Sequence, residues 1–231
     1  MFKPAVAALA VSAFALPAFA AGIHTEQVAS DSDMNAMILS KPWVVEGRFG
    51  NNNANNGDWE QGIWDPNSVA DQDNFSWVSG NAVDFTLAFT AGTNLVEFTL
   101  SDTAQQLTRT VMSFEEDGFN TLFLRTRATR DNSSILLDEL VLDGMDVGDT
   151  SFASGDDDGL GILKIAMDGL DDGFILTGQA TMIWSDPTPR GSHLAFQIKA
   201  TETEMNVIPT PTAAAAGILG IATLCLRRRR A

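Results

Sequence analysis

The densest group of residues that could carry out chemistry is a run of carboxylates in the second half of the chain. Eleven acidic residues fall between Asp138 and Asp172, with Lys164 as the only basic residue among them. Like charges at this density repel, and a hard cation with oxygen ligands, Ca²⁺ above all, would relieve the repulsion. Two Asp/Gly segments supply the candidate ligands: Asp156, Asp158, Asp168 and Asp171. Neither segment has EF-hand spacing, so plain acidic turns are the competing interpretation, and Ca²⁺ is the only cofactor considered.

Tryptophans beside a polar loop suggest a second kind of chemistry, the stacking of sugar rings. Trp59 lies within the Asn-rich segment 50–62, and Trp64 follows it closely. A flat aromatic face can cover the apolar face of a sugar while polar neighbours bind its hydroxyl groups. Packing of both rings in the core or a loop is the alternative. Trp77 and Trp184 fall in strand-like runs and are predicted to be core residues.

Catalytic motifs are lacking in the sequence. Two carboxylates could hydrolyse a glycoside, but among 30 acidic residues no local motif selects a pair. His193 has no Gly-x-Ser-x-Gly elbow to accompany it, and there is no phosphate-binding glycine loop. Arg125, Arg127 and Arg130 are predicted to pair with the acidic surface. We therefore expect no enzymatic activity, and glycoside hydrolysis ranks third among the functions considered.

β-strands must position these residues, because the apolar side chains recur with a period of two. The predicted strands are 43–49, 63–64, 75–78, a hairpin over 82–100, 121–128, 135–142, 161–167, 174–184 and 194–200. The last two are predicted to form a closing hairpin around a turn at 186–191, and 30–39 to form a short helix. Strands about every ten residues, separated by Gly, Asn and Asp, favour an antiparallel β-sandwich or jelly roll.

The N-terminal 20 residues have the pattern of a secretory signal peptide. Lys3 is followed by an apolar stretch over 5–16, and the small residues Ala18 and Ala20 form a signal-peptidase cleavage pattern. We therefore expect signal peptidase to remove residues 1–20 and the remaining chain to be exported.

The C-terminus has the pattern of a removable sorting segment. An apolar stretch over 213–226 is followed by four arginines: Arg227, Arg228, Arg229 and Arg230. These arginines favour a cytoplasmic position for that end, which places the preceding body outside the cytoplasmic membrane. A helix of this length rises about 21 Å, short of a hydrocarbon core of about 30 Å. It suits a transient membrane anchor, removed by a membrane protease, better than a permanent one.

The charge and the cysteine content of the body, which lies between these two segments, limit the functions that it can have. The whole chain has a formal net charge of −16, and residues 21–206 keep all 30 acidic residues with only nine basic ones, about −21. This charge repels phosphate backbones, so a nucleic-acid partner is excluded. The single cysteine, Cys225, lies in the C-terminal segment, so the exported body is stable without disulfides.

The C-terminal segment resembles the PEP-CTERM sorting signal of bacterial surface proteins. Pro209 and Pro211 match the two prolines of its P-E-P box, and Thr210 stands where the family usually has Glu. The apolar helix and terminal arginines complete the three-part pattern. The resemblance implies processing by exosortase, a membrane-bound transpeptidase-like enzyme, and delivery to the cell surface or an exopolysaccharide matrix.

The body resembles choice-of-anchor domains, which are bacterial surface domains found with different C-terminal anchors, and it is most similar to the W type. The similar segments are 44–50, 122–128, 174–185 and 191–199. The chain is thereby divided into a signal peptide (1–20), an N-terminal extension (21–37), a β-sandwich (38–206) and a sorting segment (207–231). We expect a secreted, non-enzymatic protein of the cell surface or extracellular matrix. A module that binds exopolysaccharide is the alternative.

Overall fold

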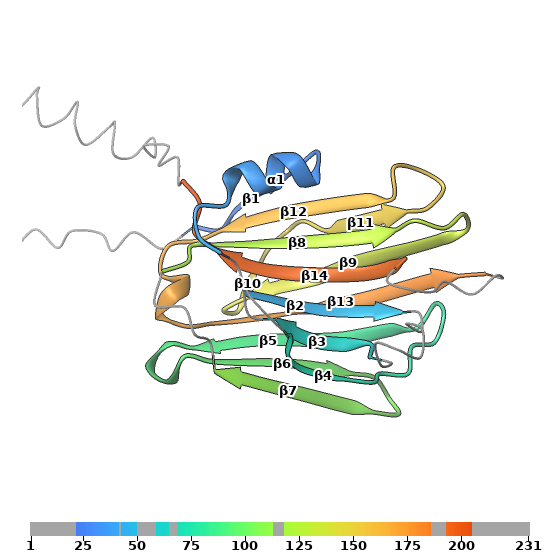
Figure 1. Cartoon of the computed structure of the whole chain (residues 1–231), viewed down its shortest axis with the longest axis horizontal. Coiled ribbons are helices and arrows are strands. Elements are labelled where there is room, and N and C mark those ends of the chain that lie inside the picture. The colour runs from blue at the N-terminus through green and yellow to red at the C-terminus, as the bar shows by residue number, and fades with distance from the viewer. Residues whose placement is uncertain are drawn as a thin grey trace, which may run out of the picture.

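The computed structural model describes residues 22–41, 43–49, 59–64, 69–112, 118–185 and 193–204. They form two sheets in which every strand pairing is antiparallel, so the predicted all-β sandwich is confirmed (Figure 1). Sheet A contains, across its width, β1 (His24–Gln27), β12 (Leu160–Ala166), β8 (Thr121–Ala128), β14 (Leu194–Thr201), β2 (Trp43–Phe49), β3 (Gln61–Trp64) and β4 (Val69–Asp73). Sheet B contains β10 (Met145–Asp146), β9 (Ser133–Leu142), β13 (Phe174–Trp184), β5 (Ala82–Thr90), β6 (Leu95–Ser101) and β7 (Gln106–Met112); β11 (Ser151–Ser154) also pairs with β9.

The core lies between the sheets and is filled by alternate residues of the strands. Along β5 the odd-numbered residues 83 to 89 are buried and the even-numbered ones point outward. Phe196 of β14 is fully buried and joins the two sheets, because its ring centroid lies 5.7 Å from that of Phe85 and 6.2 Å from that of Phe98. The period of two in the sequence therefore corresponds to one buried face per strand.

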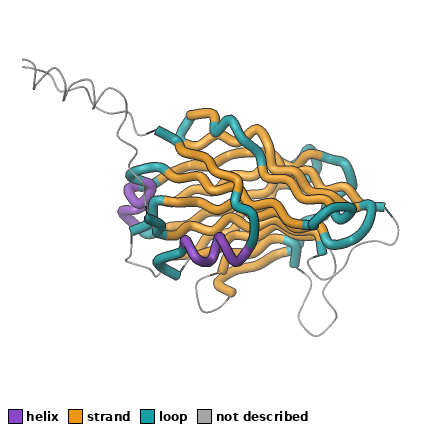
Figure 2. Tube along the Cα trace, turned by 90° about the horizontal axis from the view of Figure 1, so that it is seen from above, coloured by secondary structure: helices purple, strands orange, loops and turns teal. Residues whose placement is uncertain are grey.

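Within the described ranges the one α-helix is α1 (Asp31–Met37), which is short and lies outside sheet A (Figure 2). Ser30 caps its N-terminus, because the Ser30 hydroxyl accepts a hydrogen bond from the Asp33 amide at 3.1 Å. Met34 is 1% exposed and packs in a small second core with residues of β8, β12 and the preceding loop: Phe123, Ile162 and Val28. The predicted helix at 30–39 is thus confirmed.

Polar side chains close both open edges of the sandwich. At the edge formed by β3 and β4, Gln61 Nε2 donates to carbonyl oxygens of β6 and β7 at 2.7 and 3.2 Å. Arg109 of β7 forms ion pairs with Asp71 and Asp73 of β4. At the other edge the Ser151 hydroxyl of β11 donates to a β8 carbonyl at 3.0 Å. These contacts link the two sheets along both sides of the sandwich.

The predicted strand at 75–78 is wrong. Phe75 and Trp77 are buried as a period of two requires, but the segment belongs to no sheet. The Gln105 side chain holds it instead, accepting from the Ser76 amide at 3.3 Å and donating to the Ser76 carbonyl at 2.8 Å. Alternating burial here comes from an extended segment that packs on the core without a partner strand.

The predicted closing hairpin is also wrong. β13 pairs with β5 and β9 in sheet B, whereas β14 pairs with β2 and β8 in sheet A. These two strands, consecutive in the sequence, therefore lie in different sheets. Two consecutive strands that each bury one face can lie in the same sheet or in opposite sheets, and alternation alone does not distinguish these arrangements.

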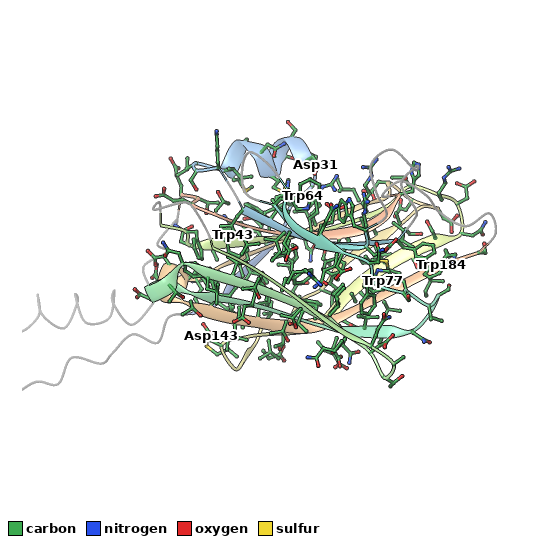
Figure 3. The ribbon with its side chains drawn as sticks, turned by 60° about the horizontal axis from the view of Figure 1, so that its bottom comes forward. Asp31, Trp43, Trp64, Trp77, Asp143 and Trp184 are labelled. Atoms are coloured by element: carbon green, nitrogen blue, oxygen red, sulfur yellow. The ribbon has the colours of Figure 1, made fainter. Side chains whose placement is uncertain are left out.

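The start of β1 and the end of β14, the first and last strands of sheet A in the sequence, lie at the same end of the sandwich, here called the near end. His24 lies opposite Ala166, Ala166 opposite Thr121, and Thr121 opposite Thr201, so the start of β1 and the end of β14 share one row (Figure 1). The other end, here called the far end, is marked by Trp184 of β13, well away from Trp43 at the near end of β2 (Figure 3).

Candidate functional site

A row of polar side chains crosses the outer face of sheet A. The register places Gln197 of β14 between Arg125 of β8 and Glu46 of β2, and Lys199 follows two residues along β14. These positions alternate with buried core residues, so their side chains leave the sheet on the face opposite the core. We call Glu46, Arg125, Gln197 and Lys199 the polar strip.

Glu46 supplies the carboxyl group of the polar strip and is only 6% exposed. Gln197 Nε2 donates a hydrogen bond to Glu46 Oε2 at 2.7 Å. Burial raises the pKa of Glu46, and the hydrogen bond from Gln197 and the charges of Arg48, Arg125 and Lys199 oppose that rise. A carboxyl group with a raised pKa marks a candidate functional site, because such groups can transfer protons near neutral pH.

The basic members of the polar strip are already partly neutralised by α1. Arg125 Nε and Nη2 donate to the two carboxylate oxygens of Asp31 at 2.6 and 2.7 Å. The hydrogen bond from Arg125 is the main cause of the lowered pKa of Asp31. Burial, and then the charge of Arg125, lowers the pKa of Lys199. The strip therefore resembles an internal charge network that fixes α1 on the sheet.

Glu46→Gln is expected to raise the free energy of unfolding at neutral pH and to leave it unchanged in acid. The folded protein holds a proton on Glu46 more tightly than the unfolded chain does. The free energy of unfolding of the parent therefore falls as the pH rises from the ordinary pKa of 4.5 through the raised pKa of the folded state. The glutamine amide oxygen can still accept from Gln197 but needs no deprotonation. Urea unfolding of both proteins from pH 3.5 to pH 8 measures the difference, and a variant less stable than the parent at pH 8 would contradict it.

The two candidate sugar-stacking residues are brought together, but not as an open platform. The Trp59 and Trp64 rings meet edge to face with centroids 5.1 Å apart. The guanidinium carbon of Arg48 lies 3.3 Å from the Trp59 ring centroid, and Arg48 Nε donates to the Trp59 carbonyl at 2.8 Å. Trp59 is only 5% exposed. One face of this ring is therefore covered by a cation within the protein itself.

The candidate calcium ligands fall into two separate groups. Asp156 and Asp158 precede β12 and Asp168 and Asp171 follow it, so the pairs lie at opposite ends of a seven-residue strand, about 20 Å apart. Asp156 Oδ1 accepts from the Asn132 amide at 2.9 Å, and Asp158 Oδ1 accepts from the Leu160 amide at 3.2 Å. Within the described ranges no three His, Cys, Asp or Glu side chains are grouped to hold one metal ion. The four aspartates cannot share an ion, and a site at either turn stays a prediction.

The far end brings together residues that the sequence analysis assigned to other roles. Phe49 of β2 and Trp184 of β13 stack with ring centroids 3.9 Å apart, and both are partly exposed. Partly buried His193 precedes Leu194, which lies opposite Phe49, and Arg127 and Arg130, at and after the end of β8, are exposed. Burial, followed by the charges of Arg130 and Arg127, lowers the pKa of His193. The only sign of this grouping in the sequence is that basic and aromatic residues occur at the ends of predicted strands. The period of two assigns each of these residues to the core or to the surface and does not indicate which of them lie together.

The signal and sorting residues fall outside the described residues: Ala18, Ala20, Pro209, Pro211, Arg227, Arg228, Arg229 and Arg230. In the part of the chain that is described, no helix has the length and apolar character needed to cross a membrane. The sequence matches no protein-family model and shows no significant match among curated proteins.

Proposed function

We propose that this chain is an exported, non-enzymatic β-sandwich protein of the cell surface or extracellular matrix. In this proposal signal peptidase removes residues 1–20, and an exosortase-type enzyme processes the PEP-CTERM-like segment 207–231. Before that processing, the C-terminal helix holds the protein in the cytoplasmic membrane. The resemblance of the body to choice-of-anchor domains supports the same role.

One observation carries the proposal: β1 begins and β14 ends in the same row at the near end. A tether that follows β14 would hold the near end toward the membrane. The far end, one strand length away, would then face outward with its exposed arginines and its partly exposed aromatic pair. The cysteine-free body, closed at both edges by side chains, suits an oxidising exterior without disulfide chemistry.

The geometry around Glu46 favours a structural role over glycoside hydrolysis. Hydrolysis needs two carboxyl groups, about 5–10 Å apart, on either side of the scissile bond. Glu46 has a raised pKa, but its hydrogen-bond partner is the Gln197 amide. Asp31, the nearest acid in the charge network, is held ionised by Arg125.

Cell fractionation with mass spectrometry of the chain ends tests this proposal. In a host that carries an exosortase, we expect a product that begins at residue 21, has lost the terminal arginines and is found outside the cytoplasm. Replacing Pro209 and Pro211 by alanine should retain the protein in the cytoplasmic membrane with residues 227–230 still attached. An unprocessed wild-type chain in the cytoplasm would overturn the proposal.

A further inference from the structure

We propose that Lys199 captures the aldehyde group of a sugar, at the reducing end of a polysaccharide, as an imine, and that Glu46 supplies the proton for this step. The capture is stoichiometric and involves no turnover, so it is compatible with a non-enzymatic protein. The inference deepens the proposed function by naming the partner, a polysaccharide, and it rests on that function for its setting. It differs from sugar stacking on Trp59, because Arg48 already covers a face of that ring.

Lys199 is the one member of the polar strip whose side chain has no partner among the described residues. Gln197 donates to Glu46 at 2.7 Å, and Arg125 donates to both carboxylate oxygens of Asp31. None of the ion pairs within the described ranges includes Lys199. Its nitrogen is not one of the polar atoms that are buried without a partner, so it reaches solvent. The Lys199 amine is therefore free to react with an external group.

Apolar side chains flank Lys199 on the outer face of sheet A. Phe123 of β8 lies opposite it on one side, and Val44 of β2 lies opposite it on the other. Phe123 is fully buried in the small core beneath α1. The segment that follows α1 is fixed beside the end of β14, because the Thr201 hydroxyl donates to the Ser40 carbonyl at 2.9 Å. Lys199 is consequently half-buried, although its nitrogen reaches solvent.

This environment lowers the pKa of Lys199. Burial is the main cause, and the charge of Arg125 on β8 adds to it. The carboxylates of Asp31 on α1 and Glu46 on β2 act in the opposite direction but do not cancel the shift. A larger fraction of Lys199 than of an exposed lysine is therefore the neutral amine, which is the form that attacks a carbonyl carbon.

Glu46 lies on the same face of the sheet as Lys199, on the neighbouring strand. Because Lys199 is opposite Val44, Glu46 is its diagonal neighbour, with Cβ atoms about 7–8 Å apart and within reach of two long side chains. Burial raises the pKa of Glu46. Burial therefore favours the neutral form of both groups, a free amine beside a protonated acid.

Imine formation requires these two forms. The Lys199 nitrogen attacks the aldehyde carbon, a C–N bond forms, and one proton moves from the nitrogen to the carbonyl oxygen. Glu46 then donates its proton to the new hydroxyl group, which leaves as water while the C=N bond forms. The remaining proton on the nitrogen returns to the Glu46 carboxylate. The sum is amine plus aldehyde giving imine plus water, with no oxidation or reduction.

The groups around Lys199 suit an aldehyde that carries hydroxyl groups. Trp64 shares the row of Lys199 at two strand spacings, about 10 Å away, and lies on the same side of the sandwich as Asp31 (Figure 3). Its partly exposed ring can cover the apolar face of a sugar linked to Lys199. The Gln197 amide and the Asp31 carboxylate, both partly exposed, can bind the hydroxyl groups.

Reductive labelling of the full-length chain in detergent tests the inference, with glyceraldehyde as the probe and cyanoborohydride to fix the imine as a stable amine. Lys41 and Lys164 are internal controls, because Lys41 is exposed and Lys164 is paired with Glu26 at 3.8 Å. Peptide mass spectrometry at pH 7 should show Lys199 modified at least tenfold faster than either. This ratio should fall as the pH approaches 10.5, the ordinary lysine pKa, where exposed lysines also lose their proton. Equal rates at pH 7, or the same ratio at both pH values, would overturn the inference.

Glu46→Gln distinguishes proton donation from a purely electrostatic role. If Glu46 donates the proton, the variant should modify Lys199 at least fivefold more slowly while the rate at Lys41 stays the same. A purely electrostatic role predicts no loss, because the Glu46 charge raises the pKa of Lys199 and its removal leaves more free amine. The control E26Q removes a carboxyl group elsewhere on the sheet and should change the Lys199 rate by less than twofold. An unchanged Lys199 rate in E46Q would refute the role of Glu46, and unfolding would instead make Lys199 and Lys41 react equally.

Propanal, which has the same number of carbon atoms and no hydroxyl groups, distinguishes a sugar from other aldehydes. The preference for Lys199 over Lys41 should be at least threefold greater with glyceraldehyde, and equal preference would refute a sugar as the partner. An exported and processed protein in which Lys199 reacts no faster than Lys41 would refute this inference and leave the proposed location intact. A reactive Lys199 in a chain that stays unprocessed in the cytoplasm would refute the proposed location alone.

Discussion

Phe196→Ala is expected to lower the free energy of unfolding by about 3–5 kcal/mol, the usual cost of deleting a buried phenylalanine ring. Phe196 is fully buried between the sheets and contacts Phe85 and Phe98 of sheet B. It also meets Trp77 edge to face at 6.4 Å. Gly47 lies directly beneath its ring, where any Cβ would overlap ring carbons. Because rigid backbone surrounds the ring, the cavity left by alanine cannot collapse fully.

Phe152→Ala is the matched control for this substitution. Phe152 lies on β11 with 53% of its surface exposed, and the same truncation there should cost less than about 0.5 kcal/mol. Urea unfolding followed by tryptophan fluorescence compares the two variants on one scale. Equal losses in both, or a loss below about 1 kcal/mol for Phe196→Ala, would show that this ring does not join the sheets.

The alternation of apolar and polar residues predicted a strand correctly where the buried face of that strand consists almost entirely of apolar side chains. Segments 43–49, 121–128 and 174–184 were predicted with the bounds that the structure shows, and the short helix predicted over 30–39 is found at Asp31–Met37. The sandwich as a fold class was therefore accessible from the sequence. These segments contain few inward polar residues, so the periodicity is uninterrupted.

The missed strands are those in which a polar residue takes an inward or edge position. β7 was not predicted because Arg109 faces inward to meet Asp73, which breaks the apolar alternation. β1 has four exposed residues and no apolar pattern at all. β9 was predicted over 135–142, but Glu139, with a φ of 50°, forms an irregularity within it, so the buried residues change from odd to even positions after it. Only the pairing of strands in the folded structure shows which partners such polar or irregular positions have.

The candidate sites were harder to predict than the fold. Trp59 and Trp64 were correctly grouped because they are close in sequence, but the position of Arg48 over Trp59 depends on the pairing of β2 with β3. Glu46 and Gln197 meet across strands separated by 151 positions. No local sequence motif indicates which residues the pairing of distant strands will place side by side.

Gly155→Ala is expected to lower the free energy of unfolding by about 3 kcal/mol, at the upper end of the cost of overpacking. The backbone of Gly155 has no positive φ, so any residue could adopt its conformation. The requirement for glycine comes from space alone, because a Cβ would overlap the carbonyl oxygen of Arg130. That neighbour is backbone, so it cannot rotate away as a side chain would. The Gly155 amide also donates to the Ser133 carbonyl at 2.8 Å, which ties the two turns together.

Gly92→Ala is the matched control, since Gly92 also has no positive φ and a Cβ there meets nothing within 4 Å. Its stability should change by no more than about 0.5 kcal/mol. Thermal and urea unfolding of both variants decide the point, and equal stability would mean that the turn at 154–159 does not rest on Arg130.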